Sequence, residues 1–195
     1  GDVTLTNETV AFNFDRGRAF TVDAMDNEET AGVAFGKLAS EFIRTKVVPE
    51  MDAFRFAQYA GTSGISKVSA GATLSTGADV ISALRVGTTK MDEDEVPMED
   101  RHLFITPTLH GLIQDMDTTK SREVMSRFAN VVLVPQSRFY IAIDLYDGTT
   151  DTSSQSGGIN QKPGGFVKAT AGKDINFMII HKPALLQYTK HTVSK

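Results

Sequence analysis

Residues 12–30, FNFDRGRAFTVDAMDNEET, decide the fold expected for this chain because two periodicities meet there. On both sides of the short tip 15–17, apolar residues alternate with polar ones, which is the pattern of half-buried strands. The alternating apolar residues are Val10, Phe12, Phe14, Phe20 and Val22. The sequence therefore predicts a two-stranded hairpin over residues 3–24. Such a hairpin is only marginally stable alone in water, so its apolar face needs another surface to cover it.

A long helix is predicted directly after the hairpin, from Asp26 to Ala60. Asp26 and Glu29 have the spacing of a capping box. Apolar residues recur along the segment at helical intervals, namely Phe35, Leu38, Phe42, Ile43, Val47, Met51 and Phe54. Pro49 should kink or split the helix because it lacks an N–H group, and Gly61 should end it. At 1.5 Å per residue the helix would be about 50 Å long, so we interpret it as a spine.

The chain from residue 62 onward is expected to form an α+β domain. Strands are predicted at 102–106, 131–135, 139–145 and 175–180, and helices are predicted from Ala78, Pro107 and Pro183. Because several of these strands are uninterrupted apolar runs, both faces of their sheet should be covered by helices. Residues 61–77 have the composition of a linker with at most one weak strand, and residues 148–165 that of a long loop.

Composition excludes several classes of protein. The chain has 195 residues, which is enough for one sizeable hydrophobic core or for a core with an extension. It contains no Cys, so it can form neither a disulfide nor a thiolate metal site. Its net charge is −4 and its Lys and Arg residues are scattered, which argues against a nucleic-acid reader. The longest apolar runs are too short to cross a bilayer, and no signal-peptide pattern is present. The absence of Cys suggests synthesis in a reducing cytoplasm, while the start at Gly1 suggests a processed form and the end at Ser194-Lys195 a fragment.

Two segments resemble ligand sites but fail on their spacing. Residues 164–174, GGFVKATAGKD, lack the phosphate-loop pattern because Val167 stands where glycine is needed and Asp174 where Ser or Thr is needed. We interpret them as a surface loop with no strand before it. Residues 91–100, MDEDEVPMED, are acidic, but Pro97 replaces the glycine bend of a calcium loop. We interpret this segment as a solvated helix end.

The remaining candidates for chemistry also fail. The four histidines, His102, His110, His181 and His191, show no paired metal-ligand spacing. Ser63 lacks the glycine placement of a nucleophile elbow. We therefore predict no enzyme activity, no catalytic residue, no cofactor and no metal site.

The hairpin-to-helix segment is nevertheless specific. Residues 12–61, FNFDRGRAFTVDAMDNEETAGVAFGKLASEFIRTKVVPEMDAFRFAQYAG, closely resemble the start of the ordered part of tailed-bacteriophage major capsid proteins, whose fold is the Hong Kong ninety-seven-type capsid fold shared with encapsulins. Three later blocks fit the same family in the same order: DRHLFITPTLHGLI (100–113), FANVVLVPQSRFYIAIDLYDG (128–148) and KDINFMIIHKPALLQYTKH (173–191). The resemblance covers most of the chain, although the later blocks are individually generic.

The resemblance implies a domain organisation. Residues 1–25 would be the extended loop (E-loop), which lies across a neighbouring subunit, and 26–61 the spine of the peripheral P-domain. Residues 62–190 would be the axial A-domain, which surrounds the local five- or six-fold axis. Residues 191–195 would begin the return to the P-domain. The family's N-terminal arm and the P-domain return strands would then be missing from this sequence.

The function implied by the resemblance is structural. The chain would be a major capsid protein that self-assembles, through pentameric and hexameric capsomers, into an icosahedral shell around double-stranded DNA. It would be made in the bacterial host cytoplasm and end in the virion, with a scaffold and a maturation protease as candidate partners and no membrane contact. DNA would be enclosed without sequence-specific binding. The alternative is an encapsulin-like shell around a cargo enzyme, and a remote third hypothesis is a small phosphate-binding enzyme using residues 164–174.

The resemblance also implies which residues contact neighbouring subunits. The basic tip of the hairpin, Arg16 and Arg18, is expected to meet an acidic surface on the spine of a neighbour. The hairpin candidates are Phe12, Phe14, Arg16, Arg18 and Phe20, and the spine candidates are Glu28, Glu29, Phe35, Leu38, Phe42, Glu50 and Asp52.

Overall fold

The structure is a computed structural model, and it describes residues 9, 11–19, 28, 33–67 and 71–188. The chain divides into two compact units, and each is considered by itself. One unit comprises Gly1–Leu38 with Leu186–Lys195, and the other comprises Ala39–Leu185. The boundary between them lies within a helix rather than at a loop.

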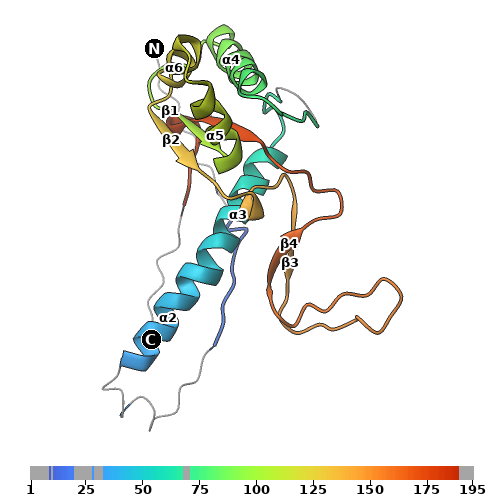
Figure 1. The fold of residues 1–195 in the computed structure, drawn as a ribbon. Helices are drawn as coiled ribbons and strands as arrows, with labels where there is room; N and C mark the ends of the chain where they lie inside the picture. The colour runs from blue at the N-terminus through green and yellow to red at the C-terminus, as the bar shows by residue number, and fades with distance from the viewer. Residues whose placement is uncertain (1–8, 10, 20–27, 29–32, 68–70, 189–195) are drawn as a thin grey trace, which may run out of the picture. The chain divides into compact units, whose positions relative to one another are not determined.

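The elements are mixed α and β (Figure 1), which confirms the α+β class. The α-helices are α2 (Val33–Phe42), α3 (Val48–Gly61), α4 (Gly77–Glu93), α5 (Pro107–Met116) and α6 (Thr119–Met125). The strands are β1 (Arg101–Ile105), β2 (Asn130–Leu133), β3 (Ile143–Tyr146), β4 (Gly165–Lys168) and β5 (Phe177–His181). Among the described residues, no helix combines the length and apolar character that crossing a membrane requires.

Pro49 alters the long helix without breaking it. Between α2 and α3 the residues Ile43–Val47 form a π-helical turn, in which the N–H of Val48 donates to the carbonyl of Ile43. Proline has no N–H and its ring crowds the carbonyl four residues earlier, so a wider turn just before it relieves the clash. Helical residues therefore run from Val33 to the predicted end at Gly61. The predicted cap at Asp26 lies outside the described residues.

The three predicted apolar strands lie side by side, as expected. The sheet order is β2-β1-β5, with β1 parallel to β2 and antiparallel to β5. Leu103 pairs with Val131 on one side and with Ile179 on the other. The strands predicted at 102–106, 131–135 and 175–180 thus belong to one sheet.

One face of this sheet is covered by α4, α5 and α6. Leu103 and Ile105 of β1 are fully buried there. The helix residues of this core are Val80, Ile81, Leu84, Leu109, Ile113 and Val124. The capping box that begins α4 involves Thr76, whose hydroxyl accepts from the N–H of Asp79 at 3.2 Å. The helix predicted from Pro107 packs Leu109 and Ile113 into this core.

The other face is covered by α3. Phe56 of α3 packs with Val134, Phe139 and Ile175, and the sheet residues Phe104, Val132 and Met178 pack against this cluster. Both faces of the sheet are thus covered by helices, as the apolar runs predict. Helix α3, which covers this face, is the C-terminal half of the predicted spine and lies in the same compact unit as the sheet.

The segment from 139 to 174 differs from its prediction. Gly165–Lys168 forms β4, which pairs antiparallel with β3, so residues 164–174 are not simply a surface loop. The loop between these strands is locally organised: the carboxylate of Asp147 accepts the N–H groups of Thr149 and Thr150 at 2.8 and 2.9 Å. These bonds, with the hydroxyl of Thr150 as the largest contribution, lower the pKa of Asp147 to about 2. Composition alone misses a strand of four residues that depends on its partner.

Three other predictions need correction. The described residues 11–19 of the predicted hairpin form no strand, consistent with the weakness of an isolated hairpin, and Val10, Phe20 and Val22 lie outside the described residues. In place of the helix predicted from Pro183, the described residues form one 3-10 turn, Lys182–Ala184. Helix α6, which the sequence did not predict, begins with a Thr118–Ser121 capping box.

Candidate subunit-contact surface

Helix α2 carries several apolar side chains that remain largely exposed. Phe35 is 51% exposed and Leu38 is 42% exposed, whereas Ala53 and Phe56 of α3 are 0% and 8% exposed. Residues three apart lie on one side of a helix, so Phe35 and Leu38 share a face, and Phe42, the last residue of α2, is half-buried. We call Phe35 and Leu38 the α2 stripe.

Other apolar side chains of this helical segment are also exposed, and of these Val33 lies on the side of α2 opposite the α2 stripe. Val33 is 49% exposed, Ile43 is 52% exposed and Val48 is 41% exposed. No residue of α2 is buried. The helical segment Val33–Gly61 thus buries apolar side chains in α3 and exposes them in α2. Exposed apolar side chains that lie together typically mark an interaction surface.

The candidate residues of the hairpin segment are mostly exposed. Phe12 is 59% exposed and Phe14 is half-buried. Arg16 and Arg18 are both exposed. Phe20 lies outside the described residues.

The acidic candidates differ from one another. Glu28 is exposed, Glu29 lies outside the described residues, and Glu50 and Asp52 are half-buried. The carboxylate of Asp52 already binds Arg138, with Nη1 and Oδ2 3.0 Å apart. Because Arg138 partly neutralises Asp52 within the same chain, Asp52 is less available to an arginine of another subunit.

A buried arginine that the sequence analysis missed lies at the start of β1. The side chain of Arg101 is fully buried, and its guanidinium donates to the carboxylate of Asp92 at 2.7 Å and to the carbonyl of Pro97 at 2.9 Å. It also donates to the carbonyl of Val96, and Arg127 donates to the second oxygen of Asp92. A buried guanidinium needs such partners because the desolvation of an unpaired charge is costly.

This network gives the acidic segment 91–100 a role that its composition did not show. The hydrogen bond from Arg101, followed by that from Arg127, lowers the pKa of Asp92 below its ordinary value. The segment 91–100 is thus held to the sheet by Asp92 and by the carbonyls that bind Arg101. No sequence motif marks this pairing, because Asp92 and Arg127 are 35 positions apart.

No group of three or more His, Asp or Glu side chains among the described residues is placed to hold a metal ion. His102 lies on the central strand between Asn130 and Ile180, and its buried Nε2 has no hydrogen-bond partner among the described residues. One unpaired ring nitrogen on a packed strand does not make a catalytic site.

Comparisons of the chain with protein-family models, with curated proteins and with solved structures each found no match. The family suggested by the residues 12–61 therefore rests on the sequence resemblance alone.

Proposed function

We propose that this chain is a shell subunit, the major capsid protein of a tailed phage or prophage, which self-assembles around double-stranded DNA. The observation that carries this proposal is the contrast within one helical segment. The α3 residues pack into the core of their own chain, whereas the α2 stripe is left largely uncovered. Half of the helix thus serves the fold, and the other half is available for another subunit.

The energetics of the α2 stripe favour association. Complete burial of a Phe or Leu side chain contributes roughly 1.5–3 kcal/mol relative to exposure. Neighbouring apolar side chains that remain exposed on a helix typically mark an interaction surface. In a homo-oligomer the same surface recurs on every subunit, so a modest contribution from each contact is repeated throughout the assembly.

The net charge of the chain fits a shell protein better than a sequence-specific DNA-binding protein. Its net charge is −4, with 20 basic and 24 acidic residues. Tight binding to DNA depends on neutralising phosphates with Lys and Arg. We propose that the shell encloses its DNA without sequence-specific binding.

Within this proposal, residues 1–25 act as the E-loop, 26–61 as the spine and 62–190 as the A-domain. The packing of Phe56 against Phe104 supports a spine that carries the A-domain on its C-terminal half. Pentameric and hexameric capsomers, a scaffold and a maturation protease would be the corresponding partners. The proposed role is structural, with no catalytic step.

Negative-stain electron microscopy of the natural full-length protein, with nuclease digestion of its contents, tests the proposal. We expect closed particles of uniform size, and particles from an infected or induced host should protect DNA from nuclease. Particles that instead retain a protein cargo and no DNA would replace the capsid with the encapsulin-like alternative. A protein that remains monomeric at every concentration would overturn both.

A further inference from the structure

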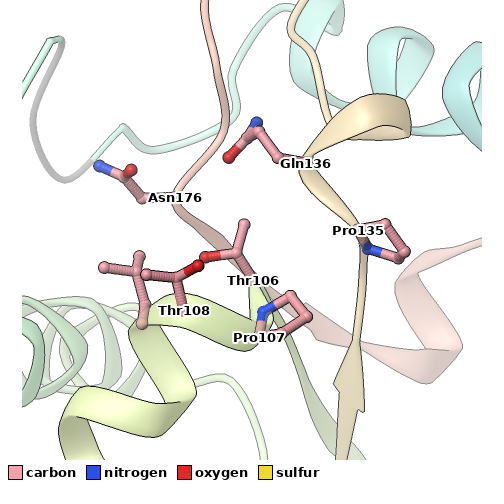
Figure 2. Close-up of a pocket in the computed structure, with 7 residues that line it drawn as sticks. Thr106, Pro107, Thr108, Pro135, Gln136 and Asn176 are labelled. Carbon is pink, nitrogen blue, oxygen red and sulfur yellow. The ribbon is translucent and has the colours of Figure 1, made fainter.

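A depression of about 420 Å³ opens where the parallel strands β1 and β2 end and helix α5 begins. Its walls come from the β1–α5 junction, from the residues after β2 and from the residue before β5. The lining residues are Thr106, Pro107, Thr108, Leu109, Pro135, Gln136 and Asn176 (Figure 2). In open sheets flanked by helices, ligands bind outside the carboxyl ends of parallel strands. The depression lies at that edge and belongs entirely to the unit Ala39–Leu185.

Three hydrogen-bond donors at this edge have no acceptor in the described part of the chain. Thr106 is the N-cap of α5, and its side chain makes no capping bond although the residue is only 5% exposed. The N–H groups of Thr108 and Leu109 belong to the first turn, where a helix provides no acceptor. Thr106 is thus a nearly buried polar residue that lines the depression and whose hydroxyl has no hydrogen-bond partner in the described part of the chain, whereas buried polar groups are normally hydrogen-bonded.

Two amide side chains face the same depression and are held in position (Figure 2). The Nδ2 of Asn176 donates to the carbonyl of Ala72 at 2.8 Å, and the Nε2 of Gln136 donates to the carbonyl of Phe139 at 2.8 Å. Their amide oxygens remain as acceptors. None of the seven lining residues is charged.

We propose that this depression binds a small oxyanion, a carboxylate or a phosphate, at the N-terminus of α5. The oxyanion accepts hydrogen bonds from the hydroxyl of Thr106 and from the N–H groups of Thr108 and Leu109, and the helix dipole favours its negative charge. A hydroxyl group on the same ligand donates to the amide oxygen of Asn176 or Gln136. Because no lysine or arginine lines the site, binding is weak, with a Kd on the order of millimolar.

NMR titration of the 195-residue chain with inorganic phosphate, acetate and glycolate tests this inference, with chloride at matched ionic strength as the reference. We expect saturable shifts of the Thr108 and Leu109 amide signals with phosphate or a carboxylate and none with chloride. Tighter binding of glycolate than of acetate would assign the ligand as a hydroxy acid, and phosphate as the tightest would assign it as a phosphate. Absence of a saturable shift with all three anions would overturn the proposal.

Two pairs of variants localise the binding. Thr106→Val removes the hydroxyl at nearly constant shape, and loss of one hydrogen bond to a charged group should weaken binding about tenfold, whereas Thr106→Ser should restore it. Thr108→Glu places a carboxylate at the helix N-terminus, which should keep the fold and repel the anion, while Thr108→Gln should still bind. Unchanged affinity in both Thr106→Val and Thr108→Glu would contradict the site.

Discussion

Phe56 on α3 and Phe104 on β1 pack edge to face, with ring centroids 5.5 Å apart and an interplanar angle of 67°. Phe56 also meets Phe139, at 4.8 Å and 72°. These contacts make the C-terminal half of the long helix part of the core beneath the sheet. On the N-terminal side of Pro49 and of the π-helical turn Ile43–Val47, α2 exposes Phe35.

Replacement of Phe56 therefore should affect folding far more than replacement of Phe35. Phe56→Ala leaves a cavity between α3 and the sheet and should lower the free energy of unfolding by roughly 3–5 kcal/mol. Phe35→Ala, on an exposed position of α2, should change it by less than about 0.5 kcal/mol. Urea denaturation of the two variants measures both values. Equal losses would mean that α3 does not form part of the core.

Two helical glycines should respond oppositely to alanine. A Cβ at Gly77 would lie 2.3 Å from the carbonyl oxygen of Leu112, so Gly77→Ala should push α4 away from α5 and lower the melting temperature. A Cβ at Gly111 meets nothing within 4 Å, so Gly111→Ala should stabilise the helix by roughly 0.5–1 kcal/mol. Thermal denaturation of the pair checks the close approach of the two helices. A gain in stability at Gly77 would contradict it.

Acid sensitivity should depend on Asp92. Its pKa in the folded chain lies below the ordinary value of 3.8, so its stabilising effect is complete above that pH and is lost as the pH falls through the folded pKa. Asp92→Asn also removes the carboxylate that pairs with the buried Arg101. We expect this variant to be less stable than the wild type at pH 7. Below about pH 4 its free energy of unfolding should fall less steeply than that of the wild type, because the variant has no carboxylate to protonate at position 92. Superimposable pH profiles of wild type and variant would contradict the proposed network.

The basic tip should matter for assembly and not for folding. Arg16→Glu with Arg18→Glu reverses two exposed charges and should change folding stability by less than about 0.5 kcal/mol. Like charges brought together at an interface can cost several kcal/mol, so assembly of the natural full-length protein should stop and recover partly at high salt. Light scattering across salt concentrations measures this. Assembly at normal yield in low salt would remove the tip from the proposed interface.

The sequence predicts the central sheet well because its signals are local. Continuous apolar runs such as 131–134 define the strands, and the Thr106-Pro107 pair marks the start of α5 at the residue observed. The predicted end at Gly61 also holds. These features depend on backbone chemistry within a few residues.

The parts that sequence reasoning missed depend on contacts between distant residues. β4 is a strand because β3 pairs with it, and nothing in residues 165–168 alone requires that. The burial of Arg101 follows from partners on α4 and in the loop before β1. The depression beside α5 combines residues 106–109 with Asn176, which are distant in the chain, so no motif could reveal it.

The most direct test of the shell proposal changes the α2 stripe in the natural full-length protein. Phe35→Ser with Leu38→Ser removes exposed apolar groups, so the double variant should keep the melting temperature of the unassembled wild-type subunit. Val33→Ser, which changes an exposed apolar residue on the opposite side of α2, is the control. Electron microscopy should show closed particles for wild type and control and only unassembled subunits for the double variant. Closed particles from the double variant at wild-type yield would contradict the account.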